Sequence, residues 1–411
     1  MMKKRMDKKE YIKTGAYLMK LIGSVLDGTP VPEAPQGISW ELFCYLAEKG
    51  AVSAVCFYGI EKLEKKPAKE IYDSLAKKRD LALYRKLHYD IEREEIMGAL
   101  QKEGISCLPL KGILLADYYP APGMREMLDN DILYGFVEKN RSGKGYQICG
   151  QNEEEKKESV QRAKLLLDRI MVERGYEKDE AESAGYHDAY MRKPMFNFEM
   201  HRELVSDKVV SFPYYKEPWR LAMQDKDNKG LFSMSDEDEY IFLISHEYHN
   251  HYVRGDSKIR FLADLHVYLK KKGRTMDWEY MKGELKAQRL LPFEKEFREL
   301  SEAVFSGKPL SVKQEALFYF LLDNGADSTE KKIDKEVEAK LLLRDTGNGK
   351  RAKFTYIWKR ICLPKEECKA YYPFFYRHRR LMPILIIYRF FKGLFTKRHR
   401  FFHEISSIWK A

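Results

Sequence analysis

Residues 108–133 read LPLKGILLADYYPAPGMREMLDNDIL, and this stretch decides the fold. An apolar run ends at Lys111-Gly112, and after a proline-rich turn a second apolar run carries Asp129 and Asp131. Because alternate side chains of a strand point to the same face, we expect the two carboxylates to lie side by side. Two carboxylates beside a Lys-Gly turn can hold a divalent cation and the phosphates that it neutralises. The pattern therefore indicates phosphoryl or nucleotidyl transfer.

The composition is that of a globular protein. The 411 residues are 44% hydrophobic and 33% charged, enough for roughly two or three domains. The start, MMKKRMDKKEYIK, is basic, but no apolar segment follows it directly, so we expect no signal peptide. None of the six cysteines forms a CxxC pair, which argues against a disulfide framework or a zinc ribbon and favours a reducing cytoplasm.

The positive charge is concentrated at the C-terminal end. Residues 351–411 hold 15 Lys and Arg against 3 Asp and Glu, a net charge of +12, whereas the other 350 residues hold 59 against 60. This segment also interleaves aromatic and basic residues, which predicts an anionic partner, either a nucleic acid or a peripheral membrane surface. A helical segment that packs its rings on the body is the alternative. Residues 381–388, its longest charge-free run, are too few to span a bilayer.

Four regions follow one another along the chain. We expect an N-terminal helical region, a sheet-containing core, a helical domain and a basic aromatic C-terminal segment, at residues 1–104, 105–213, 214–345 and 346–411. In the first region, helical periodicity and capping residues predict helices at 8–27, 38–48, 51–63 and 68–103.

The core region predicts an α+β fold with a small mixed β-sheet. The expected strands are 105–110, 128–136, 187–192 and 195–201, and the expected helices are 113–119 and 159–174. The last two strands would form a hairpin turned at Lys193-Pro194. This order predicts a mixed sheet with helices on one side. Residues 138–158 are polar, and we expect a mobile insertion there.

A third carboxylate would complete a two-metal site, and Glu199 in FNFEMHREL lies on an expected strand. In two-metal transfer, two aspartates bridge both ions, one ion binds the triphosphate, and the other lowers the pKa of the acceptor hydroxyl. We therefore expect Mg²⁺ or Mn²⁺ at Asp129, Asp131 and Glu199, with Glu199 also able to take the proton. His201 would share the face of Glu199 and orient it, touch a phosphate or have a structural role.

Lys111 and Gly112 lie where a helix is expected to follow a strand. Gly112 permits close backbone approach, free N–H groups at a helix start favour an anion, and Lys111 adds a positive charge. Arg125 can fork onto two phosphate oxygens or form a surface salt bridge. These three residues are the candidate phosphate-binding set.

The combination of LPLKGILLADYY, MREMLDNDIL and FNFEMH resembles the uncharacterised nucleotidyltransferase family of the polymerase-β superfamily. The resemblance is sharpest over 105–201 and extends into HEYHNHYVRGDSKIRFLADLHVYL and LPKEECKAYYPFFYRHRRLMP. It implies metal ligands at Asp129, Asp131 and Glu199, a nucleotide turn at Gly112, and transfer of an NMP from an NTP to a hydroxyl with release of pyrophosphate. The family's Lys-Gly replaces the Gly-Ser of other members.

Two features depart from the family pattern. The residue between the aspartates is Asn130 instead of an apolar residue. Because it would face the opposite side of the strand, we expect metal binding to survive and the core packing to change. The insertion at 138–158 is longer than expected and could cover or modify the site.

Two other functions fit the same residues. A non-catalytic nucleotide-binding or regulatory protein can use the same fold, because a fold alone does not establish activity. His246, His249 and His251 in HEYHNHY suggest a histidine-dependent metal hydrolase, although Asn250 breaks the HExxH pattern. Histidines that pack a helix against the core, or one that contacts the nucleotide or acceptor, explain this spacing as well.

Overall fold

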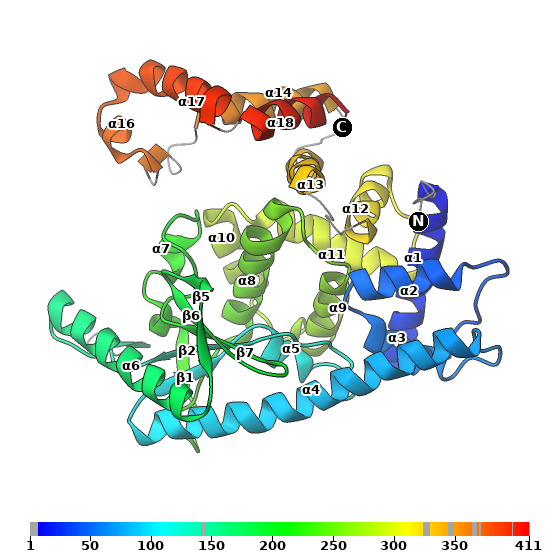
Figure 1. The fold of residues 1–411 in the computed structure, drawn as a ribbon, viewed down its shortest axis with the longest axis horizontal. Coiled ribbons are helices and arrows are strands. Elements are labelled where there is room, and N and C mark those ends of the chain that lie inside the picture. Colours follow the sequence, from blue (N-terminus) through cyan, green and yellow to red (C-terminus); the bar gives the residue numbers. More distant parts are fainter. Residues whose placement is uncertain are drawn as a thin grey trace.

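The computed structural model describes residues 7–140, 143, 145–323, 329–343, 349–363, 368–369, 371–396 and 398–410. Helices predominate, and a five-stranded mixed sheet lies among them (Figure 1). The α+β class expected from the sequence is therefore confirmed. The expected boundary between residues 345 and 346 lies outside the described residues.

The expected N-terminal helices are all present. They are α1 (Lys8–Asp27), α2 (Trp40–Lys49), α3 (Ser53–Ile60) and α4 (Lys69–Lys102). Ser39 caps α2, since its Oγ accepts a hydrogen bond from the Leu42 backbone N–H at 3.1 Å. Figure 1 shows α4 as a long helix that runs from the N-terminal helices to the far end of the sheet.

The central sheet has the strand order β1-β2-β7-β6-β5. Its strands are β1 (Ser106–Pro109), β2 (Asn130–Gly135), β5 (Glu177–Ala184), β6 (His187–Arg192) and β7 (Phe196–His201). The β2–β7 pair is parallel and the other neighbours are antiparallel. The predicted β6–β7 hairpin is present and turns at Lys193-Pro194. The sequence did not predict β5, because this edge strand is polar and lacks apolar alternation.

The two faces of the sheet contact different groups of helices. One face buries apolar side chains against α4 and α6 (Glu153–Glu173), namely Cys107, Ile132, Tyr134, Phe198 and Met200. The other face contributes Leu108 and Leu133 to a larger core that also contains residues of α1 and of the helices after the sheet. Helices therefore lie on both faces, whereas the sequence predicted one.

The helices after the sheet share one apolar core with the N-terminal helices. They are α7 (Phe212–Tyr215), η1 (Pro218–Leu221), α8 (Asp236–His246), η2 (Glu247–His251), η3 (Tyr252–Arg254), α9 (Arg260–Lys272), α10 (Trp278–Ala287), α11 (Leu291–Ser306), α12 (Val312–Leu322) and α13 (Thr329–Leu342). The short helix α5 (Gly112–Ala116) follows β1 directly. Helix α8 with η2, and helix α9, lie in the region 214–345 that the sequence predicts to be a helical domain.

Two segments expected to lack strands contain hairpins. The mobile insertion expected at 138–158 instead overlaps a hairpin of β3 (Val137–Lys139) and β4 (Tyr146–Ile148) and the start of α6, although residues 141, 142 and 144 lie outside the description. The region expected to be helical from 214 onward contains a hairpin of β8 (Ala222–Gln224) and β9 (Phe232–Met234) before α8. Three-residue strands are too short to give an alternating pattern.

The C-terminal helices form a separate layer. They are α14 (Gly349–Ile361), α16 (Pro373–Arg377), η4 (Arg379–Leu381), α17 (Met382–Thr396) and α18 (Arg398–Lys410). In Figure 1, α14, α17 and α18 lie together at the top, with α13 between this layer and the body. In the part of the chain that the structure describes, no helix is both long and apolar enough to cross a bilayer.

Candidate functional site

Strands β2, β7 and β6 place charged and imidazole side chains on one face of the sheet. Asp131 on β2 pairs with Glu199 on β7, and His201 on β7 pairs with His187 on β6. Because side chains alternate along a strand, these four residues share the face that looks toward the helices after the sheet. Asp129, one residue before β2, continues the same alternation. The structure thus brings the three predicted carboxylates to one region.

A short network joins Lys111 to this face. Its Nζ donates a hydrogen bond to Asp131 Oδ1 at 2.6 Å, and His201 Nε2 lies 2.8 Å from the same oxygen. Glu199 Oε2 lies 4.0 Å from Lys111 Nζ and 3.7 Å from His201 Nε2. The ammonium and the imidazole therefore contact Asp131 directly and lie beside Glu199.

The two aspartates have opposite pKa shifts. Burial, together with the charges of Asp131 and Glu199, raises the pKa of Asp129 to about 6. Burial alone would also raise the pKa of Asp131, but the charge of Lys111 and the hydrogen bond from His201 hold it well below the usual range. Asp129 makes no hydrogen bond or ion pair with any residue that the structure describes. Asp131 and Glu199 each have Lys111 within 4.0 Å, whereas Asp129 has no such positively charged neighbour among the described residues.

The Lys111-Gly112 turn is tightly built. Lys111 has φ 52° and ψ −116°, a combination typical of glycine in tight turns, and a lysine there is strained. A Cβ added to Gly112 would come within 2.8 Å of Arg125 Nη1. The turn therefore accepts a strained lysine and excludes a side chain at the next residue.

Arg125 is neither exposed nor unpaired. Its Nε and Nη2 donate hydrogen bonds to the two carboxylate oxygens of Asp264 on α9, at 2.8 and 3.1 Å. The Tyr119 hydroxyl donates to Asp264 at 2.8 Å, and all three side chains are buried. The expected surface salt bridge is thus a buried bidentate pair, and Nη1 is the guanidinium nitrogen directed to Gly112.

Asn130 faces the opposite side of β2, as the alternation predicts. It is fully buried, and its Oδ1 accepts a hydrogen bond from Arg93 Nη1 on α4 at 3.0 Å. Arg93 in turn pairs with Asp90 at 2.6 Å. A polar residue between the aspartates is therefore accommodated because α4 supplies a buried arginine.

Two imidazoles stand beside the carboxylates. One ligand atom from each of His187, Glu199 and His201 lies within 4.8 Å of the other two. The two rings are cross-strand neighbours with centroids 5.1 Å apart. Burial, and next the neighbouring His201, lower the pKa of His187, so its ring is neutral near pH 7. Carboxylate oxygens and neutral imidazoles are both suitable donors for a divalent metal.

A family model described as uncharacterised nucleotidyltransferase matches residues 36–144 and 156–306. The matched segments exceed half of the chain and include Lys111, Asp129, Asp131 and Glu199. The chain belongs to this family. Comparisons with curated proteins and with solved structures gave no significant match. The family assignment supports nucleotidyl transfer as the general kind of reaction.

In this family member the HEYHNHY histidines lie at the end of α8 and in η2. Among the described residues, no group of three metal-ligating side chains includes His246, His249 or His251. His249 Nε2 lies 3.0 Å from Ser211 Oγ, and His251 Nδ1 lies 3.6 Å from Asp256. Burial, and then the charge of Lys111, lower the pKa of His246 well below its usual value. His246 and His251 are neighbours, with ring centroids 5.1 Å apart, whereas His249 contacts Ser211.

Some site residues of the nucleotidyltransferase were missed from the sequence. His187 had no motif of its own, and only the β6–β7 register, which the predicted hairpin implied, could have placed it opposite His201. Asp264 lies in FLADLHVYL, where one acidic residue on an apolar helix face was the available signal of a buried ion pair.

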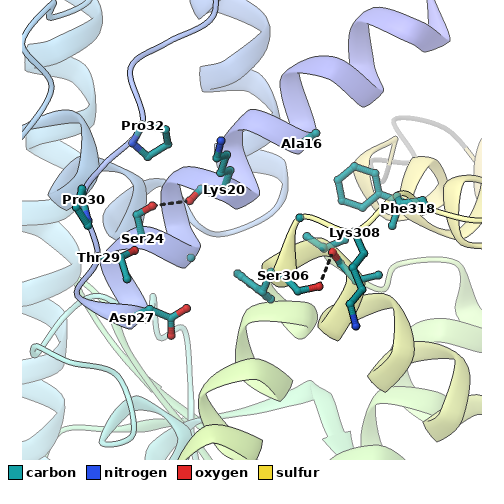
Figure 2. A pocket seen from close by; sticks show the side chains of 16 residues that line it. Ala16, Lys20, Ser24, Asp27, Thr29, Pro30, Pro32, Ser306, Lys308 and Phe318 are labelled. Atoms are coloured by element: carbon teal, nitrogen blue, oxygen red, sulfur yellow. Dashed lines mark hydrogen bonds between the residues drawn. The ribbon is translucent and has the colours of Figure 1, made fainter.

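A cavity of about 610 Å³ lies elsewhere in the nucleotidyltransferase, between α1 and the end of α11 (Figure 2). Figure 2 shows Lys20 and Ser24 on one side and Ser306 and Lys308 on the other. None of the candidate site residues lines this cavity. We therefore assign it no part in transfer.

Proposed function

We propose that the protein is a metal-dependent nucleotidyltransferase that moves an NMP from an NTP to a hydroxyl acceptor and releases pyrophosphate. The single observation that carries the proposal is the shared sheet face of Asp129, Asp131 and Glu199, set by the β2–β7 register. The family assignment supports the same reaction class. The acceptor is unspecified and can be a small molecule, a sugar, an RNA or a protein side chain.

The donor set fits a divalent cation. Asp129 has a pKa raised by burial and by two neighbouring carboxylates, and it lacks a hydrogen-bond or ion-pair partner among the described residues. A cation would relieve this repulsion. Asp129, Asp131 and Glu199 would hold Mg²⁺ or Mn²⁺, which would neutralise the triphosphate and lower the pKa of the acceptor hydroxyl.

Lys111 and Gly112 would bind the phosphates. Lys111 Nζ now contacts Asp131, and on nucleotide binding we expect it to exchange this carboxylate for a phosphate oxygen. Gly112 leaves its backbone open to close approach. Arg125 would contribute through Nη1 alone, because its other donors are held by Asp264.

Glu199 is our candidate for the base. Its side chain is 24% exposed, whereas that of Asp131 is 4% exposed, so an acceptor hydroxyl can reach Glu199 more easily. A carboxylate within hydrogen-bond reach of the hydroxyl can take its proton as the new P–O bond forms. His201 would hold Asp131 in place through its 2.8 Å contact.

The C-terminal segment, residues 346–411, would bring an anionic partner to the enzyme. The positive charge of this segment lies far along the chain from the candidate carboxylates. We place the protein in the cytoplasm, either free or at a membrane surface.

The test is Asp131→Asn, compared with Asp73→Asn on the exposed surface of α4. With labelled NTPs and a pool of candidate acceptors, we expect Asp131→Asn to lower transfer at least about a hundredfold. Circular dichroism should show both variants folded, and Asp73→Asn should retain full transfer. Full transfer by Asp131→Asn would contradict the assignment. Tight Mg-ATP binding by the wild type without turnover would favour a non-catalytic role.

A further inference from the structure

The imidazoles of His187 and His201 each make a hydrogen bond through one ring nitrogen, Nε2. His187 Nε2 lies 3.1 Å from the Glu182 carbonyl oxygen, and His201 Nε2 lies 2.8 Å from Asp131 Oδ1. Both of these oxygens only accept hydrogen bonds, so in the neutral rings Nε2 carries the proton and Nδ1 carries the lone pair. The neighbours therefore fix the tautomer of each ring.

The free nitrogens are buried. Nδ1 of His187 and Nδ1 of His201 each lack a hydrogen-bond partner in the described part of the chain, and the two residues are 7% and 1% exposed. A buried acceptor without a partner costs free energy. Histidines that bind metals usually donate their other N–H to a carbonyl or a carboxylate, which is the arrangement of both rings.

We propose that His187, Glu199 and His201 bind a divalent transition-metal ion of the Mn²⁺, Co²⁺ or Zn²⁺ class. This centre shares Glu199 with the carboxylate site, so its role in transfer rests on the proposed function. Imidazole nitrogen favours these ions over Mg²⁺, which prefers oxygen ligands. Glu199 would balance part of the charge of such an ion, and the two imidazoles would supply nitrogen ligands.

The test is pulsed EPR of the full chain loaded with Mn²⁺ alone. We expect nitrogen coupling from a coordinated imidazole in the wild type, and its loss or marked weakening in His187→Gln. His249→Gln, which changes a histidine bonded to Ser211, should keep the coupling. In equilibrium dialysis, His187→Gln should weaken Zn²⁺ binding at least about tenfold and Mg²⁺ binding less than about twofold.

Bound Mn²⁺ without nitrogen coupling in the wild type would overturn the histidine centre and leave the carboxylate site standing. Nitrogen coupling in a wild-type protein that transfers no nucleotide to any acceptor would support the metal centre while the proposed function fails. Equal Zn²⁺ affinities of the wild type and His187→Gln would also overturn the centre.

A separate observation concerns α17 in the C-terminal layer. Apolar side chains at helical spacing stand exposed along it, with Ile384 at 55%, Ile387 at 56% and Phe395 at 75%. Leu385 on another side of the helix is 1% exposed, so the helix buries one face and presents a second. Figure 1 places α17 in the outer layer, away from the sheet.

Cations stand directly before this helix. Arg377, Arg379 and Arg380 are exposed and make no ion pair with any residue in the described ranges. Exposed Phe374 lies on the same short stretch, at 58%. A segment with apolar side chains and unpaired cations has the features of an amphipathic helix that lies in a lipid interface.

We infer that α17 and the arginines before it dock on an anionic membrane surface. Ile384 and Ile387 cannot stack on nucleic-acid bases, whereas the acyl region of a bilayer accepts them. A second copy of the chain would bring together two segments of the same strong positive charge, which repel. The arginines instead complement anionic lipid headgroups.

The test is sedimentation of the full chain with vesicles of phosphatidylcholine alone or mixed with phosphatidylserine. We expect binding to the mixed vesicles that weakens with salt, and a loss of at least about tenfold in Ile384→Ser/Ile387→Ser. Val172→Ser on α6, which changes a residue 66% exposed, is the matched control and should bind as the wild type. Equal binding by the double variant, or RNA binding without vesicle binding, would overturn this inference.

Discussion

Asp131 and Glu199 are direct partners in the parallel pairing of β2 with β7, although a hairpin, a long helix and two strands separate them in sequence. The candidate centre therefore depends on strand register and not on loop conformation. A slip of one residue would turn Glu199 to the opposite face, against α4 and α6. The apolar residues on that face, such as Phe198 and Met200, oppose such a slip because they would lose their burial.

The close contact between Gly112 and Arg125 gives a first prediction. In Gly112→Ala the new Cβ would lie within 2.8 Å of Arg125 Nη1, and Arg125 cannot move away without leaving Asp264. We expect a loss of about 1–3 kcal/mol in the free energy of unfolding, measured with urea. Gly98→Ala is the matched control, since nothing lies within 4 Å of its Cβ in α4. It should gain up to about 1 kcal/mol. Equal effects of the two changes would contradict the contact.

The backbone of Lys111 gives a second prediction. Lys111→Ala and Lys111→Gly both remove the ion pair with Asp131, so they differ only in the backbone. At φ 52° and ψ −116° glycine is unstrained and alanine is not. We expect Lys111→Gly to be more stable than Lys111→Ala by about 1 kcal/mol in urea unfolding. A more stable alanine variant would show that the turn is relaxed.

The placement of the candidate carboxylates was predictable from sequence because it depends on alternation along single strands. Asp129 and Asp131 alternate on a strand, and Glu199 lies on a strand with its own apolar pattern. The partners of these groups were not predictable. Asp264 reaches Arg125 from α9, and His187 reaches the centre only through pairing of β6 with β7. Contacts between distant segments depend on packing, and a single sequence carries little local signal for them.

The same reason explains where the fold predicted from the sequence was wrong. Strand β5 is polar because it lies at the sheet edge, and the β3–β4 and β8–β9 hairpins are too short for periodicity. Helices with caps and amphipathic patterns, such as α1 and α2, were predicted closely. Local chemistry sets these elements, whereas the edge strand forms because β6 offers it hydrogen-bonding groups.

A third prediction concerns pH and Glu239 on α8. Burial, with the nearby charge of Asp236, raises the pKa of Glu239 from 4.5 to about 7, while Tyr118 donates hydrogen bonds to both of its oxygens at 3.2 Å. Between pH 4.5 and about 7, Glu239 therefore binds more protons in the folded state than in the unfolded state. The stability that protonated Glu239 contributes is therefore complete below 4.5 and is lost as pH rises through about 7.

Glu239→Gln should remove this dependence. We expect the free energy of unfolding of the wild type to fall relative to that of Glu239→Gln as the pH rises across this range, in urea titrations at several pH values. Glu279→Gln, which changes a side chain 87% exposed, should follow the wild type. A constant difference between the wild type and Glu239→Gln at all pH values would show that Glu239 titrates normally.

The last prediction separates two roles of Arg125. A residue that only binds phosphate would leave stability unchanged when it is replaced, whereas the buried pair with Asp264 predicts a large loss. Asp264→Leu leaves the buried charge of Arg125 unpaired, and Arg125→Met leaves Asp264 only the Arg260 Nε at 3.8 Å and the Tyr119 hydroxyl. We expect each change to cost about 3–5 kcal/mol in urea unfolding. The double variant removes both charges, so its loss should be smaller than the sum of the two single losses. Additive losses would mean that the two side chains stabilise the fold independently. An unchanged free energy of unfolding in Arg125→Met would mean that Arg125 has no role in stability, which would leave phosphate binding as its role.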